Sequence, residues 1–250
     1  MKRGGSATDR FREQLLAIMD RKHHEAWPFF TGATVTKAHL KIHYQQEYYV
    51  YVRDFPVFLA RIHGQNPPAA VRKMLAENIY EEDTGGLALG VSHPELFLKM
   101  MEGLRLRRAD FEQIRPLTAS RLYRAWLDRV SASRDWVVGA AAMAIFVEGS
   151  VKDRREILEP SKPKTPEEIE AYVQAHPLVR HQRVSPGAMD LIRAHQKVES
   201  GHRQDAYDMV VNYATSRAQQ QAVLACVQTS LDLWLKYRDG VARACGVKTS

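Results

Sequence analysis

Apolar residues recur at helical spacing along almost the whole of this 250-residue chain. In residues 8–22, Phe11, Leu15, Ile18 and Met19 fall on one stripe of such a helix. No two segments alternate apolar and polar residues over a length that could form a sheet. The pattern therefore predicts an all-α bundle, with helices at 8–22, 36–62 (broken or bent near Pro56), 67–83, 94–104, 108–130, 134–158, 166–175, 185–212 and 214–245.

The chain is expected to form one domain over residues 1–250, with residues 1–7 flexible. Its 28.5 kDa lies at the upper edge of the single-domain range. The one linker-like stretch, residues 159–167, contains three prolines. It is short, and the helices on both sides are too apolar to stand alone, so it is read as a connection within the domain.

Cysteine usage and hydropathy predict a cytoplasmic protein. Cys226 and Cys245 form no CxxC pair and cannot staple a domain of this size, which favours a reducing compartment. The longest apolar run, residues 136–147, is far shorter than the roughly 18 residues that a membrane-spanning helix needs.

The net charge of +7, with a pI near 9.4, raises the question of a nucleic-acid partner. Many arginines fall between residues 105 and 134, where they could follow a phosphate backbone. Apolar residues are interleaved with them at helical spacing, so we expect the solvated side of surface helices rather than a nucleic-acid site. These arginines are Arg105, Arg107, Arg108, Arg115, Arg121, Arg124, Arg129 and Arg134.

The sharpest local pattern is His195-x3-Glu199-x2-His202. Positions i, i+4 and i+7 share one helix face, so two imidazoles and a carboxylate would point the same way. Iron and other first-row metals bind these groups. The spacing alone is equally compatible with an exposed polar face.

Glu148 strengthens the metal interpretation. It ends a run, residues 136–147, that is apolar nearly all round and is therefore expected to be buried on most sides. A carboxylate there must be paired, protonated or bound to a metal. The alternative is that the helix turns toward solvent at Gly149.

A third cluster consists of Asn78 and the acids Glu81, Glu82 and Asp83, with His93 beyond a glycine-containing loop. Consecutive acids at the C-terminal end of a helix oppose the helix dipole, and a nearby cation would offset that cost. A solvated acidic turn is the alternative. With one acid taken from the third cluster, the clusters supply a ligand set of three carboxylates and three histidines from long helices, which fits a two-iron site better than a structural zinc.

The sequence resembles the haem-oxygenase-like dimetal (diiron) oxidases, relatives of the TenA and pyrroloquinoline-quinone synthase-like proteins and of the chlamydial death-domain-associating 4-aminobenzoate synthase. The resemblance spans about residues 23–202. It rests on Thr36-Lys-x-x-Leu40, Tyr48-Tyr49, Phe55-Pro56, Asn78-Ile-x-x-Glu82, Ser92-His93-Pro94-Glu95-Leu96, Glu148 and the His195 triplet. It implies a haem-oxygenase-like helical bundle that forms a homodimer, with the metal ligands Glu82, His93, Glu148, His195, Glu199 and His202.

The resemblance also implies an O2-dependent oxidoreductase that uses an external reductant. The expected cofactor is Fe(II), two per chain, with a manganese–iron pair as the variant and no haem. Its substrate would be an amino acid or fatty acid derivative that undergoes N-oxygenation, desaturation or C–C cleavage. Glu47 is a candidate extra ligand or proton carrier, and an exposed charge is the alternative. The aromatic residues that could form the substrate pocket, or simply core, are Trp27, Tyr48, Tyr51, Phe55 and Phe58.

Some positions depart from the family. Glu199 stands where the family commonly has Asp, which could alter the geometry at the second metal. The 4-aminobenzoate-forming members use a Lys and a Tyr where this chain has Leu158 and about Pro28, so that activity is not expected. The competing hypotheses are a metal-free enzyme of the TenA or quinone-synthase kind, with His and Tyr as acids and bases, and a TenA-type regulator or interaction protein.

Overall fold

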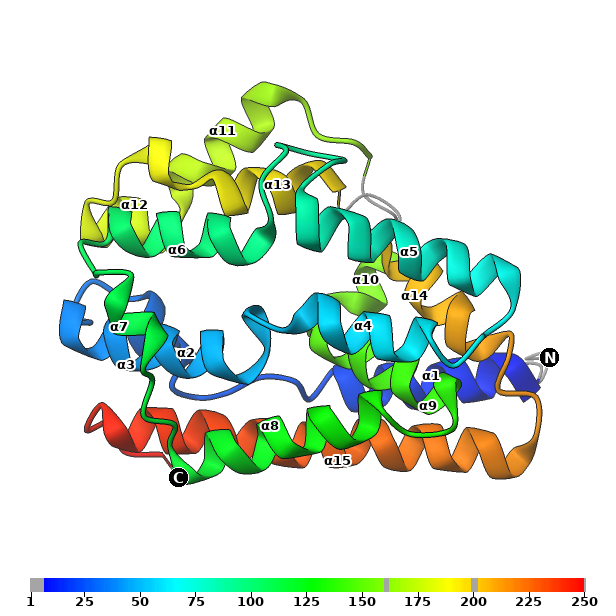
Figure 1. The fold of residues 1–250 in the computed structure, drawn as a ribbon. Helices are drawn as coiled ribbons and strands as arrows, with labels where there is room; N and C mark the ends of the chain where they lie inside the picture. The colour runs from blue at the N-terminus through cyan, green and yellow to red at the C-terminus, as the bar shows by residue number, and fades with distance from the viewer. Residues whose placement is uncertain (1–6, 160–161, 199–201, 250) are drawn as a thin grey trace, which may run out of the picture.

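The computed structural model describes residues 7–159, 162–198 and 202–249, which form helices and no strand (Figure 1). The predicted all-α class is therefore confirmed. The predicted flexible segment 1–7 lies outside the described residues except for its last residue, which begins the first helix. The elements are α1 (Ala7–Met19), α2 (Trp27–Thr31), α3 (Lys37–Glu47), η1 (Tyr48–Val52), α4 (Phe55–His63), α5 (Ala69–Thr84), α6 (His93–Gly103), α7 (Ala109–Glu112), α8 (Thr118–Ser131), α9 (Trp136–Ala140), η2 (Ala141–Val147), α10 (Asp153–Leu158), α11 (Pro166–Ala175), α12 (Pro177–Gln182), η3 (Pro186–Ala188), α13 (Asp190–Val198), α14 (His202–Val211) and α15 (Arg217–Ala244).

The longest helix, the 28-residue α15, forms the base of the bundle. It packs against α8, α1 and η2, while α6 and α13 pack together on the opposite side, with α11 beyond them (Figure 1). Buried side chains from α1 through α15 form one hydrophobic cluster. None of the described helices is long and apolar enough to cross a membrane.

Prolines and glycines divide several helices that periodicity predicts as continuous. The predicted helix 108–130 is wrong, because Pro116 lacks an amide hydrogen and separates α7 from α8. The predicted helix 185–212 is likewise divided, with α13 beginning only at Asp190. Sequence reasoning also missed α2 and α12, two short helices that each carry a proline in the first turn.

Two π-helical segments interrupt the long predicted helices. In the predicted helix 36–62, η1 follows Glu47, and the helix breaks just before Phe55-Pro56. In the predicted helix 134–158, η2 continues α9 and ends at Glu148, after which the backbone is not helical until Asp153. Such segments are rare and occur often at functional sites. Here they stand next to the two acidic residues Glu47 and Glu148.

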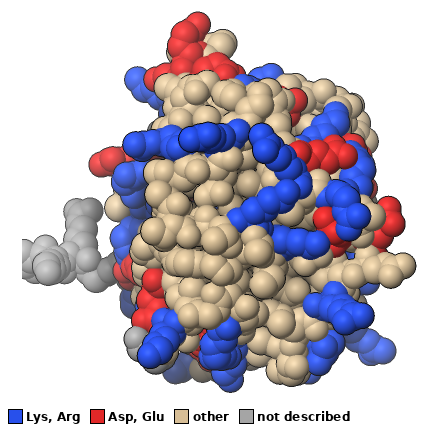
Figure 2. Space-filling view, turned by 90° about the vertical axis from the view of Figure 1, so that its left-hand side faces the viewer, with Lys and Arg blue, Asp and Glu red and all other residues tan. Residues whose placement is uncertain are grey.

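Of the eight arginines of residues 105–134, only Arg121, Arg124 and Arg129 lie on a helix, α8, and the other five lie in the connections between α6 and α9. All are exposed except Arg124, which is partly buried and forms ion pairs with Asp54 and Asp128. The apolar residues between them, such as Leu106 and Phe111, are buried. Figure 2 shows Lys and Arg side chains around one face of the molecule.

Candidate metal centre

A sharp turn brings the acidic end of α5 beside the start of α6. Helix α5 ends at Gly85, which has a left-handed conformation (φ +64°) and donates its N–H to the Glu81 carbonyl. A side chain at Gly85 would collide with the backbone of Val91. Glycine is therefore required at this turn both by the left-handed backbone conformation and by the lack of space. The chain then returns through residues 86–92, and His93 is the first residue of α6.

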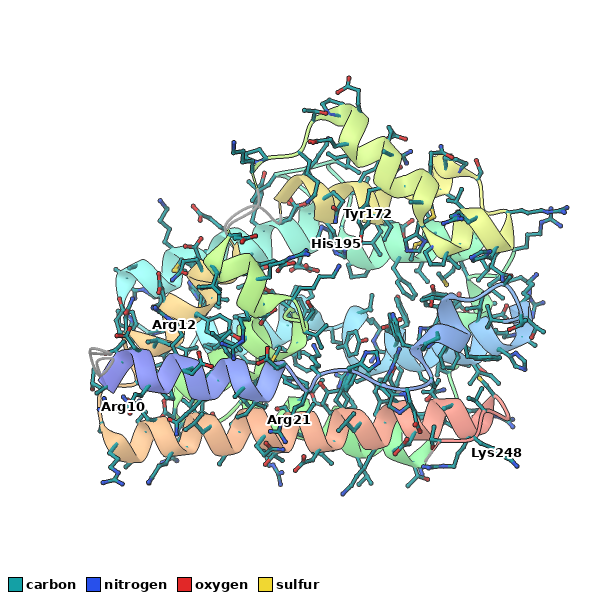
Figure 3. All side chains as sticks on the ribbon, turned by 180° about the vertical axis from the view of Figure 1, so that it is seen from behind. Arg10, Arg12, Arg21, Tyr172, His195 and Lys248 are labelled. Atoms are coloured by element: carbon teal, nitrogen blue, oxygen red, sulfur yellow. The ribbon has the colours of Figure 1, made fainter. Side chains whose placement is uncertain are left out.

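Glu82, His93 and His195 meet at this turn, each from a different helix. Their ligand atoms all lie within 4.8 Å of one another, and His93 Nδ1 is 2.9 Å from Glu82 Oε1. The two imidazole rings are nearly perpendicular, with centroids 5.0 Å apart. His195 lies on the side of α13 that faces the body of the bundle (Figure 3). The structure thus brings three of the predicted ligands together.

Glu81 orients His93 from the other side. Its carboxylate lies 3.2 Å from His93 Nε2 and accepts the Leu87 N–H at 2.6 Å, and its side chain is buried. A histidine ligand commonly donates its second ring nitrogen to a carboxylate in this way, which fixes the tautomer. Sequence reasoning had chosen Glu82 over Glu81, but both acids contact the imidazole.

The donor atoms at this point suit a cation. With Nε2–H directed at Glu81, His93 Nδ1 presents a lone pair, and it has no hydrogen-bond partner in the described part of the chain. It nevertheless faces a carboxylate oxygen of Glu82 at 2.9 Å. Two acceptors at that distance require a proton or a metal ion between them. The residues present therefore fit a metal such as iron, which takes imidazole and carboxylate ligands.

The electrostatics of the two histidines agree with this arrangement. Burial opposes protonation of His93, but the carboxylates of Glu82 and Glu81 outweigh burial and raise its pKa. Burial and the adjacent His93 lower the pKa of His195 to about 4. His195 is therefore neutral near pH 7, which is the form of imidazole that binds metals.

Glu148 adjoins this group from the end of η2. Its side chain is 24% exposed and accepts hydrogen bonds from Asn78 Nδ2 (2.7 Å) and Arg203 Nη2 (3.2 Å). Asn78 precedes Glu82 by one helical turn, so Glu148 reaches the same face of α5 that carries the proposed ligand. Both readings of the sequence hold in part: residues 141–146 are buried, and the chain turns toward solvent at Glu148.

The remaining predicted ligands cannot be placed. Glu199 lies outside the described residues. His202 begins α14, but its side chain is not among those described. Their assignment stays a prediction from the His195 triplet.

The sequence analysis did not identify two basic residues near Glu148, Arg203 and Lys22. Arg203 donates to the Ala144 carbonyl (2.8 Å) and lies 3.7 Å from buried Asp153. Lys22 donates to the carbonyls of Phe146 (2.5 Å) and Gly149 (2.6 Å), on either side of Glu148. No local pattern could have indicated them, because both act across more than 50 residues of sequence.

Glu47 and two of the predicted pocket aromatics, Trp27 and Tyr51, line a cavity of about 450 Å³. Tyr51 donates a hydrogen bond to Glu47 (2.5 Å), and His43 lies 3.4 Å from the same carboxylate. Burial alone would raise the pKa of Glu47, but its polar neighbours outweigh burial and lower the pKa to about 2. Glu47 is therefore a carboxylate. The other predicted pocket residues, Tyr48, Phe55 and Phe58, are buried in the hydrophobic cluster and are not among the residues that line this cavity.

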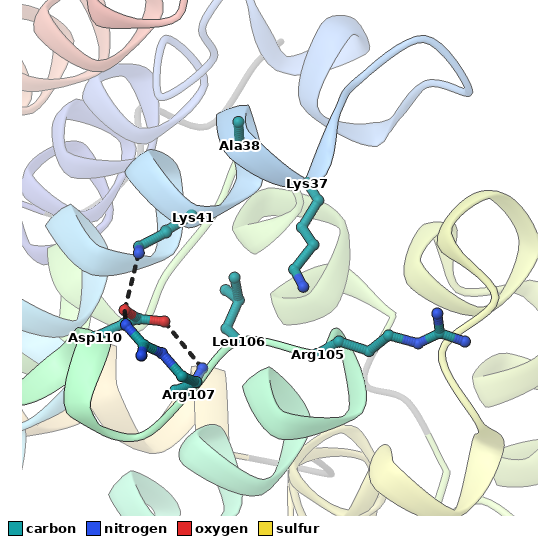
Figure 4. A pocket seen from close by; sticks show the side chains of 7 residues that line it. All are labelled: Lys37, Ala38, Lys41, Arg105, Leu106, Arg107 and Asp110. Carbon is teal, nitrogen blue, oxygen red and sulfur yellow. Dashed lines mark hydrogen bonds and ion pairs between the residues drawn. The ribbon is translucent and has the colours of Figure 1, made fainter.

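A second hollow lies on the surface, away from the metal centre. It is formed by α3 and by the segment that follows the C-terminal end of α6, whereas His93 is at the other end of α6 (Figure 4). Within it, Lys41 and Arg107 form ion pairs with Asp110 at 2.9 and 3.1 Å. Its lining residues are Lys37, Ala38, Lys41, Arg105, Leu106, Arg107 and Asp110.

Two proteins of related sequence are both named 4-aminobenzoate synthase. A 4-aminobenzoate synthase of Nitrosomonas europaea is 22% identical over 247 residues, covering 94% of this chain and 92% of that protein. The 4-aminobenzoate synthase of Chlamydia muridarum is 27% identical over 136 residues, which cover 53% of this chain and only 56% of that protein.

The fold is shared with a TenA homologue from Pseudomonas syringae pv. tomato. Its crystal structure superimposes with a TM-score of 0.70 at 14% identity, covering 97% of this chain and 99% of that one. Residues 42–235, most of the chain, match a family profile described as iron-containing redox enzyme. The chain therefore belongs to this haem-oxygenase-like family of iron-containing redox enzymes, as the sequence resemblance implied.

Proposed function

We propose that this protein is a non-haem diiron oxidase or oxygenase that activates O2 to oxidise a small substrate. The observation that carries the proposal is His93, whose Nε2 is held by Glu81 while its Nδ1 faces a carboxylate oxygen of Glu82 at 2.9 Å, beside His195. Membership of the iron-containing redox enzyme family supports iron as the metal. Bound iron would supply the electron transfer to O2 that side chains cannot perform.

Each residue has a defined task in this proposal. Glu82, His93 and His195 would hold iron at the group of ligand atoms that the structure brings together, and Glu148, Glu199 and His202 would supply the remaining ligands of the diiron site. Two further contacts keep Glu148 in place. Asn78 and Arg203 donate hydrogen bonds to its two oxygens, which fixes the carboxylate beside α5. Glu81 keeps Nδ1 of His93 free for the metal, because it binds the other ring nitrogen.

The substrate is proposed to differ from that of the relatives named 4-aminobenzoate synthase. Leu158, at the position where the sequence departs from them, ends α10 with 74% of its surface exposed and carries no chemical function. An amino acid or fatty acid derivative remains the proposed substrate class. A homodimer, an external reductant and a cytoplasmic location complete the proposal.

The test begins with protein purified without oxygen and reconstituted with Fe(II). We expect about two irons per chain, and O2 consumption that chelation abolishes. His195→Ala and Glu148→Ala should each lower the iron content and O2 consumption, whereas Glu77→Ala, on the exposed side of α5, should change neither. Unchanged iron content and O2 consumption in the first two variants would refute the proposal. An activity that survives chelation would indicate the metal-free enzyme.

A further inference from the structure

The cavity beside Glu47 contains a buried cation whose two terminal nitrogens have no hydrogen-bond partner among the described residues. Arg238, on α15, has only 2% of its surface exposed. Neither of its terminal nitrogens has a hydrogen-bond partner among the described residues, and its nearest carboxylate oxygen, on Glu47, is 3.9 Å from Nη1. That carboxylate is already engaged by Tyr51 and His43. Burying a guanidinium whose N–H groups lack acceptors costs folding free energy, unless a bound ligand accepts those hydrogen bonds.

Aromatic side chains surround this guanidinium and shape what could bind. Its central carbon lies 4.7 Å from the ring centroid of Trp27 and 5.7 Å from that of Trp234. Both indoles line the cavity, together with Tyr172 from α11. Trp27 is 42% exposed, so it forms the outer wall. The walls therefore suit a flat or apolar body, and the arginine supplies the polar anchor.

The charge balance of the cavity favours an anion. Arg238 and Lys152 contribute positive charge, whereas burial lowers the pKa of Lys22 to about 7, so Lys22 carries only part of a charge near neutral pH. Glu47 is the one carboxylate among the described residues that line the cavity. Lys22 already donates to backbone carbonyls, whereas both terminal nitrogens of Arg238 are buried without a hydrogen-bond partner among the described residues. Arginine binds planar carboxylates through two parallel hydrogen bonds.

The cavity also extends to the segment that follows Glu148, a proposed iron ligand. Gly149 and Ser150, which follow Glu148 directly, line it. Lys22 lines it as well and holds the backbone on both sides of Glu148. A ligand anchored at Arg238 would therefore lie against the segment that carries a proposed iron ligand.

We propose that Arg238 is the specificity-determining residue of a small-molecule site in this cavity, and that it binds the carboxylate of a ligand with an aromatic or otherwise apolar body. The ligand is the substrate only if the proposed diiron function holds. The binding itself requires no iron. Glu47 opposes the ligand charge and keeps Arg238 partly neutralised while the site is free.

The proposal is tested with benzoate and its neutral isostere benzamide on the metal-free chain of residues 1–250. Binding is followed by calorimetry and by quenching of tryptophan fluorescence, since Trp27 and Trp234 line the site. We expect benzoate to bind about 10- to 100-fold more tightly than benzamide, because only the carboxylate pairs with the guanidinium. Inorganic phosphate should compete weakly, because it lacks the apolar body.

Three variants distinguish the contribution of Arg238 to benzoate binding from that of its neighbours. Arg238→Gln should abolish the preference for benzoate, and Glu47→Gln should strengthen benzoate binding by removing the competing charge. The matched control is Arg129→Gln: Arg129 also stacks on an indole, 4.9 Å from Trp126, but does not line the cavity. The control should bind benzoate like the wild type. If Arg238→Gln does not fold, the benzoate–benzamide comparison and Glu47→Gln still decide the matter.

Equal binding of benzoate and benzamide to the wild type would overturn the proposal. Retained preference in Arg238→Gln, or weaker benzoate binding in Glu47→Gln, would do the same. Iron content is measured separately on the same proteins, so failure of this site and failure of the diiron function are distinguishable.

Discussion

Replacement of Glu81 by glutamine probes the orientation of His93 without removing a proposed ligand. The glutamate carboxylate accepts both from His93 Nε2 (3.2 Å) and from the Leu87 N–H (2.6 Å). An amide of the same shape has one accepting oxygen, so one of these two donors would face an NH2 group. A lost hydrogen bond to a charged partner costs about 1.5–3 kcal/mol. Loss of a carboxylate behind a metal-bound histidine weakens metal affinity about 10- to 100-fold, which agrees with that range.

Fe(II) affinity is measured without oxygen by competition with a chromogenic chelator. We expect Glu81→Gln to bind iron about 10- to 100-fold more weakly than the wild type. Glu77→Gln is the matched control, since Glu77 lies on the same helix with 58% of its side chain exposed. Thermal unfolding verifies that both variants are folded. If Glu81→Gln binds iron within twofold of the control, Glu81 does not position His93 and the reasoning is wrong.

Two further predictions concern stability. Gly149→Ala places a Cβ against the Ile145 carbonyl and 2.5 Å from Asp153 Oδ2, so urea unfolding should show a loss of about 1–3 kcal/mol. Gly187→Ala, whose Cβ would meet nothing closer than 3.6 Å, should change far less, and equal losses would contradict the tight packing. Burial lowers the pKa of His43 from 6.5 in the folded chain. Below pH 6.5 the His43 imidazole is therefore protonated in the unfolded chain but still neutral in the folded chain, which lowers the stability of the fold. The wild type should therefore lose more stability between pH 7 and pH 5 than His43→Gln does, and equal losses would exclude His43 as the cause.

The class of fold is readable from the sequence because a helix face is a local property. A stripe such as Phe11, Leu15 and Met19 needs only its own spacing to be recognised, and these residues are indeed buried. Helix ends follow from sequence where glycine or proline acts directly, as at Gly85 after α5. The break at Pro116 was predictable on the same ground but was outweighed by the apolar periodicity around it.

The candidate site is only partly readable in this way. The His195 spacing and the acids before His93 indicate metal-binding chemistry, and the structure places Glu82, His93 and His195 together. Which of two adjacent acids faces which ring nitrogen depends on the rotation of α5 against α6, and that rotation is set by packing. The contacts of Lys22 and Arg203 with the η2 segment join residues 124 and 59 positions apart, so no local pattern contains them.

A proton and a metal ion would compete for the same position, between Glu82 Oε1 and His93 Nδ1. Glu82 Oε1 and His93 Nδ1 face each other at 2.9 Å, and the raised pKa of His93 means that a proton compensates the carboxylates when no other cation is present. Glu81 stays hydrogen-bonded to the opposite nitrogen in either state, so the exchange needs no rotation of the ring. A metal ion must displace that proton to bind, as metal ligands generally require. The two acids of α5 that contact His93, buried Glu81 and partly buried Glu82, are therefore stabilised in the folded chain without a metal ion, while Asp83, the third acid, is exposed to solvent. This explains how α5 can end in three consecutive carboxylates and still pack against α6.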